Sequence, residues 1–252
     1  MRPIAVVTGA SSGLGAATAR ALSDRYTVYC AARRLDRLQV LAGEIGGIAI
    51  ACDVTDPESI AHLSATVGDR VDLLVNNAGG AFGQEPLATD DLDRWTRMYA
   101  VNVRGAAQVT QALLPALVAA HGSIVFVTST AAETAYEGGG GYCGVKSAER
   151  AMAGSLRLEL SGQPVRVMEI SPGMVHTKEF SLTRFDGDQA RADAVYADVP
   201  GVLVAEDIAE TIAWMANRPP HVNIDRLVIR PLAQAANFKV FHGQYPQRTF
   251  VD

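Results

Sequence analysis

Residues 3–15 read PIAVVTGASSGLG and join a short apolar run to a cluster of glycines. The run over 3–8 predicts a buried parallel strand, because such strands are covered on both faces. The glycines let the backbone turn sharply and approach a pyrophosphate, while the next helix, to about Asp24, directs its free N–H groups at that anion. The stretch therefore predicts the opening of an α/β fold that binds a nucleotide cofactor, with a packing turn as the alternative. The expected cofactor contacts here are Gly9, Ser11, Ser12, Gly13, Leu14 and Gly15.

The second predicted strand, 26–32, is followed by two arginines, Arg33 and Arg34. At this distance from a glycine turn, a carboxylate would bond the ribose diol of a cofactor that lacks a 2'-phosphate. Guanidinium groups instead suit a phosphate, which accepts paired hydrogen bonds. We therefore predict NADP(H) rather than NAD(H). In the alternative interpretation, one arginine only caps the next helix, about 34–45, together with Asp36.

Polar and small residues also follow the third and fourth predicted strands, 47–52 and 71–75. Asp53 either accepts a hydrogen bond from the adenine amino group or caps the turn 55–57, and both interpretations stay open. After the fourth strand, two amides and two small residues can tie loops together and leave space for a ring. The further expected cofactor contacts are Asp53, Val54, Asn76, Asn77, Ala78 and Gly79.

Tyr142 and Lys146 are four residues apart, so a helix that begins near Tyr142 presents both side chains on one face. A free phenol has a pKa near ~10 and is a poor acid–base group at neutral pH unless nearby positive charge favours the phenolate. Lys146 supplies such a charge. Ser129 follows the fifth predicted strand, 123–128, and offers a hydroxyl to the same point. The pattern predicts an acid–base site, although the same residue types also fall at such spacings by chance.

Composition narrows the class of protein. The chain has 252 residues, 48% of them hydrophobic, which is enough for one large core and for a single domain over 1–252. A net charge of -5 gives no basic face for nucleic acid, and no apolar run has the length of a membrane span. We see no signal peptide at the N-terminus. Cys30, Cys52 and Cys143 are widely spaced, which favours reduced thiols in the cytoplasm over disulfides or a metal site.

Several motifs occur together in one order: Thr8-Gly9-x-x-x-Gly13-x-Gly15, Asn76-Asn77-Ala78-Gly79, Ser129, Tyr142-x-x-x-Lys146 and Pro172-Gly173. In this combination the chain resembles the short-chain dehydrogenase/reductase family over residues 4–231. The resemblance implies a doubly wound Rossmann-type fold, with a seven-stranded, mostly parallel sheet and helices on both faces. It also implies hydride transfer to or from a nicotinamide.

The resemblance assigns roles to individual residues. Tyr142 is implied as the general acid/base, and Lys146 as the group that tunes Tyr142 and binds the nicotinamide ribose. Ser129 is implied as the hydrogen-bond partner of the substrate oxygen, and Asn102 as the holder of a water that links Lys146 to solvent. A Pro-Gly turn lets the backbone approach the nicotinamide, so the expected contacts on that side are Tyr142, Lys146, Pro172, Gly173, Val175 and Thr177.

Residues 178–204 form a long polar connection, of the kind that tends to be a mobile lid over a site. Glu179-Phe180-Ser181, Arg184-Phe185 and 220–224 resemble a bacterial and fungal branch of the family that oxidises small 3-hydroxy acids with NADP. That resemblance implies a carboxylate substrate, for which Arg184 or Lys178 is the candidate cation, with a solvated lid charge as the alternative. Glu137 and the run 175–178 depart from the pattern of the branch. A reductase of bulkier ketones, or a cofactor-sensing protein without chemistry, remains an alternative.

Two helices have apolar stripes at helical spacing: one from about Asp90 through Asn102 to about Ala119, and the one that carries Tyr142. In the family the equivalent helices pack on a second subunit, so we expect a homo-oligomer, as a tetramer, although the stripes can also simply face the sheet. The segment 207–216 is expected as the last helix and 227–230 as the edge strand. The aromatic and basic tail, 237–252, either reaches a neighbouring subunit or is loosely ordered.

Overall fold

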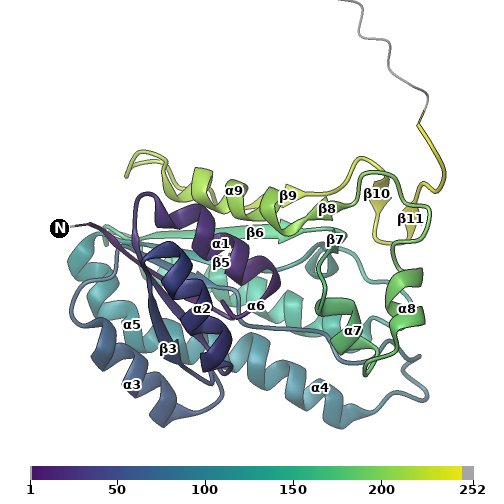
Figure 1. Ribbon diagram of the computed structural model, residues 1–252, viewed down its shortest axis with the longest axis horizontal. Helices are drawn as coiled ribbons and strands as arrows, with labels where there is room; N and C mark the ends of the chain where they lie inside the picture. The colour runs from purple at the N-terminus through teal and green to yellow at the C-terminus, as the bar shows by residue number, and fades with distance from the viewer. Residues whose placement is uncertain (1, 246–252) are drawn as a thin grey trace, which may run out of the picture.

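The computed structural model describes residues 2–245, and a sheet of seven parallel strands lies at its centre (Figure 1). The strand order is β3-β2-β1-β4-β5-β6-β9, so the chain winds from β1 to one edge and then from β4 to the other. In such sheets ligands bind beyond the carboxyl ends of the strands, where the winding reverses. The predicted seven-stranded Rossmann-type fold is confirmed. The strands are β1 (Ile4–Thr8), β2 (Thr27–Ala32), β3 (Ile48–Ala51), β4 (Leu73–Asn76), β5 (Ser123–Val127), β6 (Arg166–Pro172) and β9 (Leu227–Ile229).

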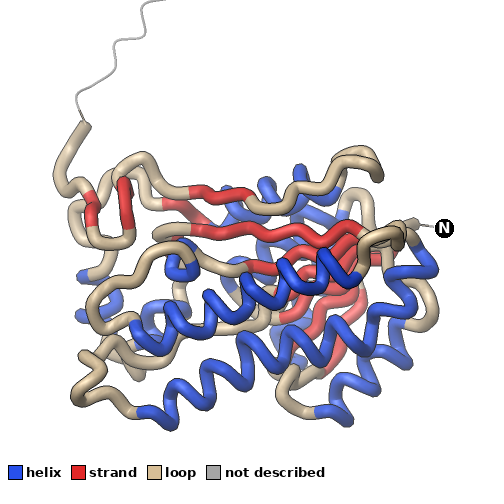
Figure 2. The backbone as a smooth tube through the Cα atoms, turned by 180° about the vertical axis from the view of Figure 1, so that it is seen from behind, coloured by secondary structure: helices blue, strands red, loops and turns tan. Residues whose placement is uncertain are grey.

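Helices cover both faces of this sheet (Figures 1 and 2). On one face, Leu22, Leu38 and Ile212 of three helices join the same buried cluster, and on the other face Leu63 and Leu113 do so. Side chains along each strand alternate between the two clusters, which is why the strands are apolar at every position rather than at every second one. The helices of the first face are α1 (Gly13–Ser23), α2 (Leu35–Ile45) and α9 (Ala205–Ala216), and those of the second are α3 (Pro57–Val67), α5 (Ala106–Ala120) and α6 (Gly140–Glu159).

Helix α3 is absent from the sequence prediction, which placed only a turn at 55–57. The start of this helix carries strong local signals: the Asp56 carboxylate accepts hydrogen bonds from the backbone N–H groups of Glu58 and Ser59, and Pro57 occupies the first turn. Apolar Ile60 and Leu63 then face the core. Both capping residues are part of the sequence, which therefore contains the signal for this helix.

The predicted long helix through Asn102 is interrupted. It begins as α4 (Leu92–Tyr99), continues as one π-helical turn, η1 (Ala100–Gly105), and only then becomes α5. Such π turns are rare and are found at functional sites more often than elsewhere. Here the turn contains Asn102, whose side chain is fully buried.

The lid segment 178–204 is more ordered than the sequence indicated. It contains α7 (Phe180–Arg184) and α8 (Gln189–Ala194), and it ends in β8 (Leu203–Val204), which pairs in parallel with β7 (Val175–His176). Together with β7, these elements lie beyond the carboxyl ends of the parallel strands (Figure 1).

The described part of the tail forms a short antiparallel hairpin, β10 (Gln234–Ala236) with β11 (Lys239–Val240). The end of the predicted tail, 246–252, lies outside the described residues, so the two expectations for the tail stay predictions. Within residues 2–245, no helix combines the length and the apolar character that crossing a bilayer requires.

Candidate active site

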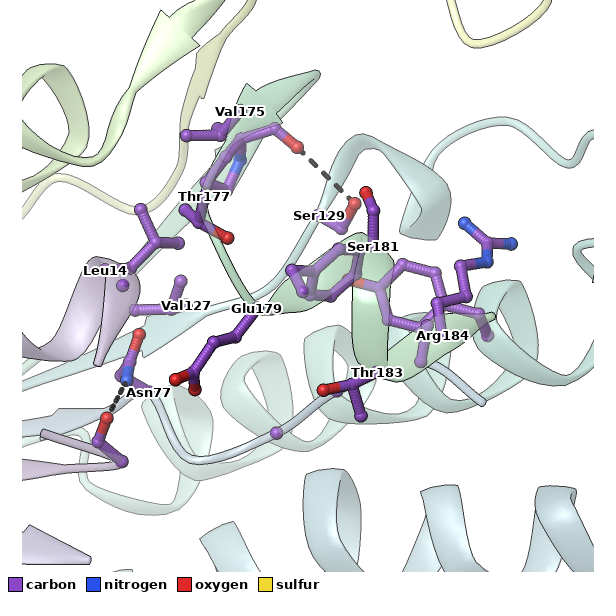
Figure 3. Close-up of a pocket in the computed structure, with 18 of the residues that line it drawn as sticks. Leu14, Asn77, Val127, Ser129, Val175, Thr177, Glu179, Ser181, Thr183 and Arg184 are labelled. Carbon is purple, nitrogen blue, oxygen red and sulfur yellow. Dashed lines mark hydrogen bonds between the residues drawn. The ribbon is translucent and has the colours of Figure 1, made fainter. Parts of the chain in front are cut away.

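A cavity of about 680 Å³ lies at the carboxyl ends of the parallel strands. Its walls come from the turns that follow β1, β2, β3, β4, β5 and β6, from the start of α6 and from the lid (Figure 3). The predicted catalytic side chains Ser129, Tyr142 and Lys146 all line this one cavity, as does Arg184. Most predicted cofactor contacts line it as well: Gly9, Ser11, Ser12, Gly13, Leu14, Arg33, Arg34, Asp53, Val54, Asn77, Ala78, Gly79, Pro172, Gly173, Val175 and Thr177.

The glycine turn after β1 is held by close packing against the end of β4. Gly9 has a φ of 69°, and a Cβ there would lie 2.8 Å from the Asn77 amide nitrogen. A Cβ on Gly15 would lie 2.4 Å from the Gly9 carbonyl oxygen. The Asn77 amide in turn donates to the Thr8 carbonyl at 2.8 Å. Gly15 is thus a packing position beneath the turn, and it does not line the cavity as the sequence interpretation expected.

Helix α1 points its uncapped N-terminus at the cavity. The Ser12 side chain makes no capping hydrogen bond, and the first turn contains no acidic residue. The free N–H groups and the positive end of the helix dipole are therefore available to an anion. Gly13 leaves room there, because the nearest atom to a Cβ at this position would be on Thr177 at 3.6 Å. This donor set fits the pyrophosphate of a dinucleotide.

Beside this turn, Arg34 lies among groups that can donate hydrogen bonds to a phosphate. Its guanidinium donates to the hydroxyls of Ser11 and Ser12 at 2.8–3.1 Å. It also pairs with the carboxylate of Glu179 from the lid at 2.8 Å, and Arg37 contacts the same carboxylate. The hydrogen bond from Arg34 and the one from Arg37 hold the pKa of Glu179 down at about 2. Arg34 is the N-cap residue of α2, but its side chain makes no capping hydrogen bond there and is bonded to Ser11, Ser12 and Glu179 instead.

Two other predicted cofactor contacts have structural roles. The Asp53 carboxylate accepts from the backbone N–H and the hydroxyl of Thr55 at 2.9 and 2.7 Å, so it holds the turn while still lining the cavity. The Asn76 amide donates to the Thr110 hydroxyl of α5 at 2.8 Å, and Asn76 is not part of the cavity wall. Its expected cofactor contact is corrected: the side chain points into the sheet–helix interface, since it belongs to the last position of β4.

Two cations lie near the Tyr142 ring. The Lys146 ammonium lies 6.0 Å from the ring centre, and the Arg184 guanidinium lies 5.8 Å from it. Phe180 of the lid packs edge-on against the ring at 5.8 Å. The Ser129 hydroxyl accepts from the backbone N–H of Ala131 at 3.1 Å, as the cap of a short 3-10 turn. Both hydroxyls therefore lie in one cavity next to fixed positive charge.

Lys146 is almost fully buried, with 5% of its surface exposed. Its ammonium donates to the Val127 carbonyl at 3.0 Å and to the Glu149 carboxylate at 2.7 Å. Burial lowers the pKa of Lys146, but the Glu149 carboxylate and Tyr142 together more than offset this, and the net direction is upward. Asn102 does not line the cavity. Its amide group instead bridges the loop after β4, since it both accepts from the Gly80 N–H at 3.1 Å and donates to the Gly80 carbonyl at 3.0 Å.

Sequence reasoning missed Tyr136, a second tyrosine of the cavity. Tyr136 lies on the cavity wall, and its hydroxyl accepts from the Arg184 guanidinium at 2.9 Å. Burial raises the pKa of Tyr136 to about 12.

Of the two candidate lid cations, Arg184 is at the cavity, whereas Lys178 is exposed and not part of the cavity wall. Glu137 is likewise exposed and outside this cavity.

A family model described as short chain dehydrogenase matches residues 3–184. The chain belongs to the short-chain dehydrogenase family. It is therefore an oxidoreductase, and the expected family membership is confirmed. No group of three or more side chains suited to bind a metal ion is present among residues 2–245.

Three proteins place the chain within the short-chain dehydrogenases. It is 54% identical over 235 residues to an uncharacterized oxidoreductase of Mycobacterium tuberculosis, covering 92% of each chain. It is 37% identical over 239 residues to an NADP-dependent 3-hydroxy acid dehydrogenase of Shigella flexneri, covering 92% of this chain and 96% of the relative. The solved closed form of a serine dehydrogenase complexed with NADP+ superposes with a TM-score of 0.89 at 35% identity, over 96% of this chain and all of the other.

Proposed function

We propose that this short-chain dehydrogenase interconverts a small 3-hydroxy acid and the corresponding 3-oxo acid or semialdehyde, with NADP(H) as the cofactor. The observation that carries the proposal is the position of Arg184. Its guanidinium lies 5.8 Å from the Tyr142 ring, and within residues 2–245 no carboxylate forms an ion pair with it. A planar cation next to the acid–base group, without an internal counter-charge, is suited to bind a substrate carboxylate through paired hydrogen bonds.

The relatives support the same substrate class. One similar protein is named for NADP-dependent oxidation of 3-hydroxy acids, and the similar solved structure is a serine dehydrogenase. Serine is itself a 3-hydroxy acid. The Arg34 guanidinium with the Ser11 and Ser12 hydroxyls makes a donor set that fits a 2'-phosphate, which supports NADP(H) rather than NAD(H).

The residues of the chain have separable roles in this proposal. Bound NADP(H) supplies or accepts the hydride. As a carbonyl is reduced, the oxygen becomes negative, and the hydroxyls of Tyr142 and Ser129 stabilise that charge by hydrogen bonding while Tyr142 delivers a proton. In the oxidation direction, Tyr142 takes the proton as phenolate, which the Lys146 ammonium favours. Arg184 holds the carboxylate end so that the hydroxyl or carbonyl meets Tyr142.

The test is a substrate panel followed by the absorbance of the reduced nicotinamide, with NADP and NAD compared. We expect activity with serine, allo-threonine or 3-hydroxyisobutyrate, and little activity with aryl ketones. Arg184→Met is expected to raise KM for the hydroxy acid by about 10- to 100-fold, as for loss of a hydrogen bond to a charged group. Lys178→Met, which removes an exposed lid cation, is the matched control and should change KM little. Efficient reduction of aryl ketones with no hydroxy acid turnover would replace the proposal with the bulkier-ketone alternative.

Compartment and assembly are part of the proposal. The three thiols, Cys30, Cys52 and Cys143, are buried and unbridged, and burial raises the pKa of each, so none is poised to react. Free thiols support a reducing, cytoplasmic location.

A homotetramer is supported by the outer faces of α5 and α6, which lie side by side on one side of the molecule (Figure 2).

A further inference from the structure

Glu149 is a buried acid next to the acid–base pair that neither the family motif nor the proposed function uses. It lies on α6, three residues after Lys146, and only 1% of its surface is exposed. One of its carboxylate oxygens lies 2.7 Å from the Lys146 ammonium. A buried charge without a partner is strongly unfavourable, so this contact explains why a carboxylate is tolerated at this position.

The contact uses part of a limited set of donors. An ammonium has three N–H groups. One N–H of Lys146 is directed at the Val127 carbonyl and one at Glu149. A single N–H is then left for anything above it in the cavity. Glu149 thus fixes the position of the ammonium relative to Tyr142, one helical turn earlier.

Within the described residues, Lys146 is the one cation that acts on the Glu149 carboxylate. The other titratable group that acts on it is Glu169 of β6, itself buried and bonded by the Thr128 hydroxyl at 2.7 Å. Burial raises the pKa of Glu149 and the proximity of Glu169 adds to this, while Lys146 opposes it.

Of the remaining charges on the elements packed against α6, Arg184 of α7 lies 5.8 Å from the Tyr142 ring centre, and the others are directed elsewhere. On α4, Arg94 pairs with Asp91 and Asp186, and Arg97 lies over the Phe82 ring. Arg104 of η1 is exposed. The charged groups nearest the acid–base pair are therefore Glu149 at Lys146 and Arg184 at Tyr142, and Arg184 is unchanged in variants of Glu149.

We propose that Glu149 is a positioning residue that holds the Lys146 ammonium and partly cancels its charge, so that the phenolate of Tyr142 forms at higher pH than Lys146 alone would allow. The inference rests on the acid–base role of Tyr142 in the proposed function. The physical basis is electrostatic: the phenolate is an anion, and a second anion in contact with the ammonium reduces the attraction that stabilises the phenolate.

The test is the pH dependence of kcat/KM for hydroxy acid oxidation with NADP. Glu149→Gln keeps the shape of the side chain and removes its charge. We expect the limb of the profile on which activity rises with pH to move to lower pH, because the ammonium of Lys146 then acts on Tyr142 with its charge no longer offset by Glu149. Glu149→Asp retains the charge and should leave the limb near its wild-type position. An unmoved limb in Glu149→Gln, or one moved to higher pH, overturns the inference.

A second readout needs neither substrate nor cofactor. The near-ultraviolet absorbance of the phenolate is titrated in the wild type and in Glu149→Gln, each against its own Tyr142→Phe background. The Tyr142 signal should appear at lower pH in Glu149→Gln. If Glu149→Gln does not fold, Glu149→Met removes the same charge with an apolar side chain of similar length and should give the same direction. A shifted titration in a protein that oxidises no hydroxy acid would reject the proposed function and retain this inference; an unshifted one rejects the inference alone.

Discussion

The ring of Tyr142 has two cations near it, the Lys146 ammonium and the Arg184 guanidinium, although the sequence pointed to Lys146 as its cation. The Lys146 contact is local, because four residues along a helix return to the same face. The Arg184 contact depends on how the lid folds over α6. At this scale the phenol has one cation from its own helix and one from a distant segment.

Tyr142→Phe is expected to reduce kcat by about 10²- to 10⁴-fold, since it removes the proton donor and acceptor and leaves the ring in place. The ring packing against Phe180 should persist. NADPH binding, measured by fluorescence titration, should change little. Near wild-type turnover in this variant would contradict the assignment of Tyr142.

Local spacing accounts for the part of the site that the sequence predicted. Tyr142, Lys146 and Ser129 follow from one helix period and one strand end. The ion pair of Arg34 with Glu179 joins residues 145 positions apart, and the burial of Glu149 depends on β6, so neither leaves a signal in a short stretch. The sheet was predicted well, because continuous apolar runs mark parallel strands.

Among the elements, α7 carries two charged groups that point in opposite directions from the start and end of the same segment (Figure 3). Glu179, just before α7, reaches Arg34 after β2 and Arg37 of α2. Arg184, the last residue of α7, reaches Tyr136 and the Gly83 carbonyl. The lid is therefore attached at the cofactor side and at the substrate side. A 2'-phosphate that binds Arg34 must compete with Glu179 for the same guanidinium.

Glu179→Gln is expected to tighten NADPH binding by about 3- to 10-fold, because the phosphate no longer displaces a carboxylate from Arg34. NADH binding should respond less. Because the pKa of folded Glu179 is lowered from 4.5 to about 2, the ion pair is fully present above about pH 4.5 and is lost as pH falls toward 2. The difference between variant and wild type should thus be constant from pH 6 to 8.

Fluorescence titration of NADPH measures this effect, and Glu137→Gln, an exposed acid outside the cavity, is the matched control. Unchanged or weaker NADPH binding in Glu179→Gln would count against competition at Arg34. The contribution of the ion pair to global stability is expected to stay at about 1 kcal/mol or less, since its side chains are partly exposed.

For the whole molecule, the outer faces of α5 and α6 are the expected subunit contact. Leu158 of α6 is 78% exposed in the single chain, so it is available for a contact with a second subunit. Size-exclusion chromatography with light scattering should give a tetramer at micromolar concentration. Leu158→Glu should shift the population toward smaller species, whereas Val40→Glu, on an exposed position of α2, should not. A wild-type monomer would reject the assembly.

The π turn that contains Asn102 changes the direction in which side chains after it face, relative to side chains before it. A π turn holds one more residue than the α-helical register allows. Removing one residue between Ala100 and Asn102 would restore continuous α-helix and rotate everything on one side of the turn by about 100° relative to the other. Either Asn102 would leave Gly80 or the apolar stripe of α5 would leave the sheet. The inserted residue therefore allows Asn102 to bond Gly80 while the apolar side chains of α5 still pack on the sheet.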